Sequence, residues 1–151
     1  MSDTHGIRMV DVGGKPVSQR TARASARLRA APETIQRIRA GGLEKGDAIA
    51  TARLAAIMAA KRTSDIVPLC HPLPLDAVEI VIGFADPDAV VIETLVRATA
   101  RTGVEMEALV AASAAALAIY DMCKSIDRGM TIEWVRLDEK TGGTRGDYRR
   151  G

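Results

Sequence analysis

Residues 103–124 read GVEMEALVAASAAALAIYDMCK, and this stretch decides the fold. An uncharged, alanine-rich run at 108–120 separates the acidic pair Glu105 and Glu107 from Asp121 and Lys124. The run predicts a helix that is apolar nearly all round and therefore buried on several sides. Glu107 and Asp121 would lie about 40° apart around its axis but roughly 21 Å apart along it. One small pocket in one subunit would not use both ends, whereas two copies of the helix from two subunits could.

Residues 21–30, which precede this helix in the chain, alternate between small apolar and polar side chains. Such a period of two predicts a half-buried strand, although alanine and arginine individually favour helices. Arg20 is in phase with the apolar side, so it could point inward at the beginning of the strand. Arg23, Arg27 and Arg29 are on the other side and would meet solvent or a partner.

Two helices are expected next. Pro32 and Gly41-Gly42 have the positions that begin and end a short helix. Asp47 is a candidate N-cap for a second helix that extends to about Lys61. Residues 68–75 then read PLCHPLPL, in which three prolines predict a stiff, extended segment.

The remaining segments predict three more strands. Alternating residues at 78–84 and apolar residues at 90–100 form a hairpin around the turn at 85–88. The long helix, from about 104 to 125, follows the hairpin, and a last strand covers 130–137. The segment from 140 to 151 is rich in glycine and basic residues.

This order predicts an α+β protein with the ferredoxin-like βαββαβ pattern, in which one antiparallel sheet carries helices on one face. Apolar residues on both sides of the 90–100 strand predict that the other face is covered as well, so we expect a homo-oligomer. The chain is expected to be a single domain over 1–151, with flexible ends at 1–10 and 141–151.

Composition excludes several classes of protein. Lys plus Arg number 21 against 19 Asp plus Glu, a net charge of +2, so the chain is no polybasic nucleic-acid binder. Aromatic residues make up 3%, which is too few for an RNA-recognition sheet that stacks bases. Cys70 and Cys123 have no CxxC spacing and are expected to be reduced thiols, and with His71 they supply too few ligands for a zinc site.

The sequence also indicates where in the cell the protein is expected. The N-terminus has no signal-peptide pattern. The uncharged run at 108–120 falls short of the roughly 18 residues of a membrane span. We therefore expect a soluble, cytoplasmic protein.

Two positions at helix ends are candidates for chemistry. Asp121 lies in the last turns of a helix, where a carboxylate opposes the helix dipole. Partial burial would raise its pKa, while Lys124 would lower it, and a carboxylate so placed is a candidate for general acid–base work. The alternative is a structural Asp121–Lys124 pair. Lys45 precedes a helix N-terminus and could complete an anion site, or it is an ordinary solvated lysine.

The other candidates are weaker when each is taken alone. His71 lies in a stiff, proline-rich segment, which suits a site residue that must keep its orientation. A structural histidine that hydrogen-bonds a backbone carbonyl could occupy the same segment. Glu105 and Glu107 could serve a site or merely stabilise the first turn of their helix. Lys61 and Lys140 add to a surplus of cationic donors that suits a polyphosphate ligand better than a sugar or a peptide.

Several longer motifs resemble one known family. They are MVDV at 9–12, KGD at 45–47, ATAR at 50–53, AAKRT at 59–63, PLCHPL at 68–73, TGVEMEAL at 102–109 and IYDMCK at 119–124. These segments cover nearly the whole chain in order and are similar to the molybdenum cofactor biosynthesis protein C family of cyclic pyranopterin monophosphate synthases. Gly13-Gly14 and Trp134 depart from that pattern and do not touch the expected site.

The resemblance implies a ferredoxin-like homohexamer, a trimer of dimers with sites where subunits meet. It implies a lyase that converts 3′,8-cyclo-7,8-dihydro-GTP to cyclic pyranopterin monophosphate and diphosphate, with no cofactor beyond Mg²⁺ escorting the phosphates and no metal site. Carried over by motif, the catalytic residues are Asp121, Lys124 and Lys45. The substrate-binding residues are Leu69, Cys70, His71, Met106, Glu107, Glu105, Arg20, Lys61 and Lys140. A non-catalytic, oligomeric nucleotide-sensing module is the alternative.

Overall fold

A computed structural model describes residues 6–151, which form a five-stranded sheet and four helices. The strands are β1 (Ser18–Arg29), β2 (Ala77–Ala85), β3 (Ala89–Ala100), β4 (Thr131–Thr141) and β5 (Tyr148–Arg149). The helices are α1 (Pro32–Ala40), α2 (Ala48–Ala60), α3 (Thr63–Ile66) and α4 (Glu105–Cys123). Of the end expected to be flexible at 1–10, residues 1–5 lie outside the described part of the chain.

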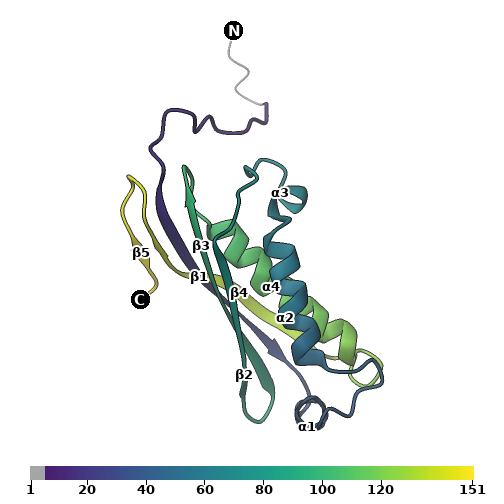
Figure 1. Cartoon of the computed structure of the whole chain (residues 1–151). Helices are drawn as coiled ribbons and strands as arrows, with labels where there is room; N and C mark the ends of the chain where they lie inside the picture. Colours follow the sequence, from purple (N-terminus) through teal and green to yellow (C-terminus); the bar gives the residue numbers. More distant parts are fainter. Residues whose placement is uncertain (1–5) are drawn as a thin grey trace.

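All neighbouring strands are antiparallel, and their order across the sheet is β2-β3-β1-β4-β5 (Figure 1). β1 is therefore central, paired along its length with β3 on one side and with β4 on the other. The register shifts twice along β4, between the partners of Arg23 and Ala24 and between those of Arg27 and Leu28. The predicted α+β class and antiparallel sheet are confirmed.

The two long helices, α2 and α4, lie side by side on one face of the sheet (Figure 1). Their contact is made by small side chains, and Ala52, Ala56, Ala108 and Ala112 are all fully buried. On the sheet, Leu28, Ile92 and Val96 complete this core. Alanine at these positions lets the two helix backbones approach each other closely.

α4 is the core helix that the sequence predicted. Its composition and length would also allow it to cross a membrane, with a mean hydropathy of 1.5, but 56% of that apolar window is buried inside the protein. The prediction that this segment is too short for a membrane span was based on the uncharged residues 108–120 alone, whereas the helix is longer and extends from Glu105 to Cys123. Burial against α2 and the sheet accounts for its apolar surface instead.

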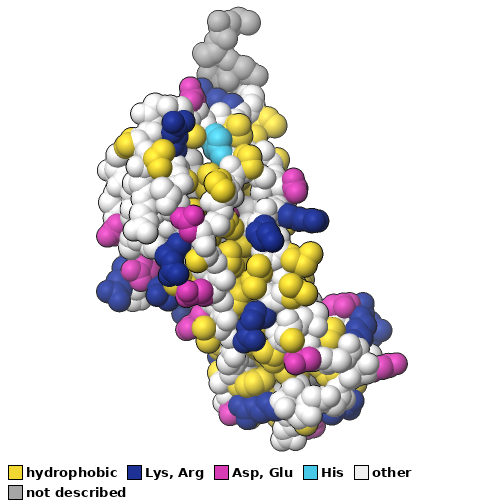
Figure 2. Space-filling model, in the orientation of Figure 1, with side chains coloured by type: hydrophobic (Ala, Val, Ile, Leu, Met, Phe, Trp, Pro, Cys, Tyr) yellow, Lys and Arg dark blue, Asp and Glu magenta, His cyan; other side chains and the backbone are white. Residues whose placement is uncertain are grey.

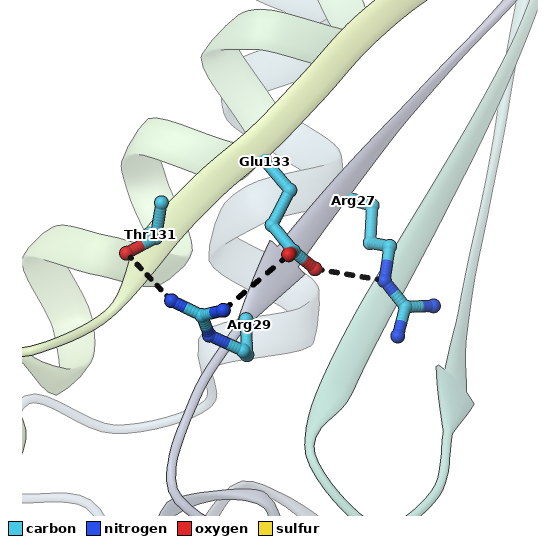
Figure 3. A network of polar contacts seen from close by, with 4 residues as sticks. All are labelled: Arg27, Arg29, Thr131 and Glu133. Carbon is cyan, nitrogen blue, oxygen red and sulfur yellow. Dashed lines mark hydrogen bonds and ion pairs between the residues drawn. The ribbon is translucent and has the colours of Figure 1, made fainter.

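The opposite face of the sheet carries a polar network between β1 and β4 (Figure 3). Glu133 accepts from Arg27 Nε at 2.9 Å and pairs with Arg29 Nη1 at 3.5 Å. Arg29 Nη2 also donates to Thr131 Oγ1 at 3.5 Å. The predicted alternation of β1 is thus confirmed, because Arg27 and Arg29 lie on the face that the helices do not cover.

The capping residues in the sequence correctly predicted both ends of α1 and the beginning of α2. Pro32 begins α1, and Gly41 ends it in the left-handed region with φ of 72°. The Asp47 side chain accepts from Ala50 N at 3.0 Å, which confirms the predicted N-cap of α2.

The main differences from the predicted elements are extensions and one added turn. β1 begins at Ser18 rather than at 21, β4 continues to Thr141 rather than ending at 137, and the short helix α3 was not predicted. The glycine-rich segment, for which the sequence predicted flexibility from 141, forms a turn that leads into β5, where Arg150 N donates to Asp138 O at 2.7 Å.

Candidate active site

The C-terminal end of α4 holds a carboxylate between two lysines. Asp121 Oδ2 accepts from Lys45 Nζ at 2.9 Å, and its Oδ1 lies 3.0 Å from Lys124 Nζ. Lys124 is the C-cap residue of α4, and Lys45 lies in the turn that the Asp47 cap connects to α2. Packing of α2 against α4 therefore brings together residues that are 76 positions apart in the chain.

The two ammonium groups control the charge of Asp121. The hydrogen bond from Lys45 is the largest influence and, with that from Lys124, holds the pKa of Asp121 below its ordinary value of 3.8. Of the two influences that the sequence offered, burial and Lys124, burial is weak in the single chain, because the Asp121 side chain is 54% exposed. Asp121 is consequently a carboxylate at neutral pH, suited to accept a proton, with ammonium donors beside it.

The N-terminal end of α4 has the opposite character. Glu107 is 2% exposed, and its Oε1 has no hydrogen-bond partner among the described residues. The Cys70 thiol lies 3.9 Å from the other oxygen, Oε2. Burial raises the pKa of Glu107 above 4.5, and burial together with the Glu107 charge raises that of Cys70. The free oxygen of this buried carboxyl lacks a hydrogen-bond donor, and a bound ligand could supply one.

A cavity of about 300 Å³ opens beside Glu107. Its wall is built by the stiff segment Pro72–Pro74, by Lys61 at the end of α2, and by Thr63 and Ser64 of α3. The volume is at the lower end of what a small-molecule pocket needs, about 300–1,000 Å³. The predicted residues Lys61 and Glu107 thus line one cavity, and sequence reasoning missed Thr63 and Ser64, since α3 itself was not predicted.

The other residues predicted from the proline-rich segment lie next to this cavity in the chain. Leu69 is 42% exposed, His71 is half-buried, and Met106, beside Glu107 on α4, is 37% exposed. Exposed apolar side chains of this kind are available to a ligand or to another subunit.

Arg20, Glu105 and Lys140 meet near the same end of α4 but around a second, smaller cavity. Lys140 Nζ lies 3.4 Å from Glu105 Oε1. Arg20 is buried, as its phase in the strand predicted, and its guanidinium donates to the carbonyls of Ala100 and Arg101. Lys15, Thr144 and Arg145 also line this cavity, and nothing in their spacing pointed to them.

The predicted residues therefore form two groups, one at each end of α4, which a single chain does not bring together. Lys45, Asp121 and Lys124 lie at the C-terminal end, and the remaining predicted residues belong to the N-terminal end. Within residues 6–151, no three His, Cys, Asp or Glu side chains are grouped as a metal ion would require.

Comparison with known proteins identifies the family. The MoaC family model matches residues 9–143. Proteins named cyclic pyranopterin monophosphate synthase match over 150 residues, 99% of this chain. Those of Streptomyces coelicolor, Herpetosiphon aurantiacus and Brevibacillus brevis are 56%, 55% and 51% identical, and the match spans 88%, 92% and 94% of their respective lengths. On this agreement in sequence, extent and order, the chain belongs to the MoaC family.

Proposed function

We propose that this protein is a lyase of molybdenum cofactor biosynthesis that converts 3′,8-cyclo-7,8-dihydro-GTP to cyclic pyranopterin monophosphate and diphosphate. Membership of the MoaC family and the names of its relatives support the reaction. The observation that carries the assignment to a site is Asp121 held between Lys45 and Lys124. A cytoplasmic location fits such a biosynthetic enzyme.

The reaction needs proton transfers and charge stabilisation. The guanine-derived ring opens and recloses as a pterin, and each step moves protons between nitrogen, oxygen and carbon atoms. Asp121 would accept such a proton while an adjacent ammonium of Lys124 or Lys45 donates one. Both kinds of group lie within 3.0 Å of each other, so one site offers a base and an acid at neutral pH.

Formation of the cyclic phosphate is a phosphoryl transfer. A substrate hydroxyl oxygen forms a bond to the α-phosphorus, the bond from that phosphorus to the bridging oxygen breaks, and diphosphate leaves with the electron pair. The hydroxyl proton passes to a base or to water. Cationic side chains stabilise the charge that grows on diphosphate. Lys61 and Arg20, which line the two cavities, would take this role.

Glu107 and its neighbours would bind the base of the substrate. Its partner-free Oε1 can accept from a ring N–H or an amino group, and when protonated the carboxyl can also donate. Cys70, His71, Leu69 and Met106 would surround the ring from the adjoining segments. Mg²⁺ would arrive with the phosphates, because it is usually held through phosphate oxygens and few protein ligands.

We further propose that the active site is completed between subunits of a homohexamer, a trimer of dimers with a ferredoxin-like protomer. The sheet order β2-β3-β1-β4 supports that protomer fold, with β5 as an added edge strand. The support for shared sites is the separation of the two residue groups by the length of α4, roughly 21 Å between Glu107 and Asp121. A second protomer could bring its own Asp121 end to the Glu107 end of the first.

Apolar side chains on the surface support the assembly. Leu54 and Leu117, on α2 and α4, are 59% and 60% exposed, and Val81 of β2 is 60% exposed. Figure 2 shows hydrophobic side chains gathered along the helical side of the molecule. Patches of this kind mark protein–protein contacts more often than free surface.

The test is diphosphate release from the cyclised triphosphate. Asp121→Asn and Lys124→Gln should each bind substrate and lose turnover by about 10² or more, since general acid–base groups contribute that much. Glu33→Gln, which removes an exposed acid on α1, is the matched control and should retain turnover. A nucleotide-sensing module would bind the substrate and release no diphosphate, and near-normal turnover of both variants would remove the proton-transfer assignment.

A further inference from the structure

The first turn of α1 is capped by a residue from a distant part of the chain. Ala31, the N-cap residue, has only a methyl group and makes no side-chain capping hydrogen bond. Asp127 supplies the missing acceptor, because its Oδ2 accepts from Ala31 N at 2.9 Å and from Thr34 Oγ1 at 3.0 Å. A carboxylate at the beginning of a helix is also favoured by the helix dipole. Asp127 lies 96 positions from Ala31, so it ties α1 to a different element.

The same residue closes the turn that follows α4. Asp127 N donates to the carbonyl of Cys123, the last residue of α4, at 3.1 Å. The other carboxylate oxygen, Oδ1, accepts from Gly129 N at 3.1 Å. Lys124, one of the two lysines that bind Asp121, lies inside this turn. Asp127 is therefore joined to Lys124 through its backbone and to α1 through its side chain.

α1 leads into the turn that carries Lys45, the other lysine of the Asp121 cluster. Arg37 Nη2 donates to the carbonyl of Gly42 at 2.9 Å, which fixes the chain where it leaves the helix. Leu43, the next residue, is buried in the core. Lys45 itself lies in no helix or strand. Its position is consequently set by the elements on either side, by α1 before it and by the Asp47 cap of α2 after it.

α1 depends on polar contacts to stay in place. Its buried apolar side chains are Ile35 and Ile38, and the third buried residue is Thr34, which is 3% exposed. Figure 1 shows α1 at the end of the molecule where α2 begins and α4 ends. Hydrogen bonds to a carboxylate are stronger than those between neutral groups, and loss of Asp127 would leave the buried Thr34 hydroxyl without this acceptor. The Lys45 turn would then lose the support on its α1 side.

We propose that Asp127 is a positioning residue for the reaction: it holds α1 against the turn of Lys124 and thereby keeps Lys45 beside Asp121. For its effect on turnover, this inference rests on the proposed function. The contact of Lys45 with Asp121 belongs to the protein alone, so it can be followed without any substrate. A cap that served only stability would strengthen α1 and leave this contact unchanged.

The experiment compares the full-length protein with its Asp127→Ala variant by carboxyl-carbon NMR titration of Asp121. Lys45 should no longer be held at 2.9 Å from the Asp121 carboxylate, so the pKa of Asp121 should rise. With cyclised triphosphate as substrate, kcat should fall by at least about tenfold, because a misplaced catalytic group slows the chemical step. KM should change less, since the residues proposed to bind the base lie at the other end of α4.

Two substitutions at Thr34 separate positioning from folding. Thr34→Val removes one of the two hydrogen bonds to Asp127 Oδ2 and should raise the pKa of Asp121 in part, whereas Thr34→Ser keeps the hydroxyl and should leave it unchanged. Asp76→Asn is the matched control. Asp76 also accepts from a threonine hydroxyl, that of Thr99 at 3.0 Å, but lies just before β2, outside the hydrogen bonds that join α1 to α4.

An unchanged pKa of Asp121 in folded Asp127→Ala would overturn the proposal, and so would an equal rise in Asp76→Asn. Thermal unfolding shows whether each variant is folded. If Asp127→Ala is not, the Thr34 pair decides, and equal pKa values of Asp121 in Thr34→Val and Thr34→Ser would count against positioning. Failure of the proposed function would be seen separately, as absence of diphosphate release by the unmodified protein, and would leave the titration result intact.

Discussion

The protonation state of Asp121 is determined by two neighbouring lysines, whereas the sequence could only identify Asp121 as a candidate. The sequence weighed burial, which would raise its pKa, against Lys124, which would lower it. In the structure the carboxylate is exposed, and Lys45, from a distant turn, makes the hydrogen bond that lowers its pKa most. Asp121 is therefore ionised at neutral pH, with an ammonium group bound to each of its oxygens.

Replacing Lys45 should shift the titration of Asp121. In Lys45→Gln the pKa of Asp121 should rise toward 3.8, because the strongest hydrogen bond from an ammonium is lost. Lys124→Gln should also raise the pKa of Asp121, because Lys124 lowers it through both a hydrogen bond and its charge. Carboxyl-carbon NMR titration measures both. Lys61→Gln is the control, and an unchanged pKa of Asp121 in Lys45→Gln would contradict the assignment.

Glu107 should make the free energy of unfolding depend on pH, in the sense opposite to that of a carboxyl with a lowered pKa such as Asp121. Its pKa is raised in the folded state by burial, so the folded protein holds the proton more tightly than the unfolded chain. The stability that Glu107 contributes is then fully present below pH 4.5, the ordinary pKa of its carboxyl, and is lost as pH rises through the pKa of the folded state. Glu107→Gln has no proton to lose, so its Tm relative to that of the unmodified protein should increase from about pH 4 to about pH 8.

Thermal unfolding of both proteins at equal concentration checks this, because Tm of an oligomer depends on concentration. A Tm difference that stays constant over this pH range would show that Glu107 does not titrate as described.

At the scale of elements, the packing of α2 on α4 sets the site geometry. The helices meet through fully buried alanines, among them Ala56 and Ala112, and this contact brings Lys45 to Asp121. There is no empty space at such positions for a larger side chain. The alanine-rich composition is thus a requirement of the close approach between the helices.

Ala56→Leu should therefore destabilise the protein by about 1–3 kcal/mol, the usual cost of adding methylene groups to a well-packed core. The measurement is the free energy of unfolding from urea denaturation. Arg53→Leu puts the same side chain on the exposed side of α2 and should change stability far less. Equal losses in the two variants would show that the helix contact tolerates larger residues.

At the scale of the whole molecule, the proposed sharing of the active site between subunits can be tested directly. If each site takes the Asp121 end of one protomer and the Glu107 end of another, two inactive variants can complement each other. In a two-fold dimer of one Asp121→Asn and one Glu107→Gln protomer, one of the two sites contains both native residues.

Mixing these variants one to one, with subunit exchange, should restore about a quarter of the native turnover, because half of the dimers are mixed and half of their sites are intact. Turnover of the mixture is measured against each variant alone, which should be nearly inactive. No gain on mixing, with exchange shown by mass spectrometry of the mixed assemblies, would place each site within one protomer.

The elements of this fold could mostly be predicted, because their signals are local. Period-two alternation marked β1, Pro32 and Gly41 marked α1, and Asp47 marked the beginning of α2. Signals were weakest for short elements. Neither the four residues of α3 nor the pair in β5 is long enough to show a period, and their positions depend on contacts with the rest of the chain.

The sequence by itself determined the fold class, the family and the residues to examine, since these depend on residue type, local spacing and long motifs. Only the tertiary structure decided which of those residues meet. It joined Lys45 to Asp121, left Glu107 buried with an unpartnered oxygen, and brought Asp127 to the beginning of α1. The physical reason is that charge state and pairing depend on distances and burial between segments far apart in the chain, and no local pattern of residues contains these quantities.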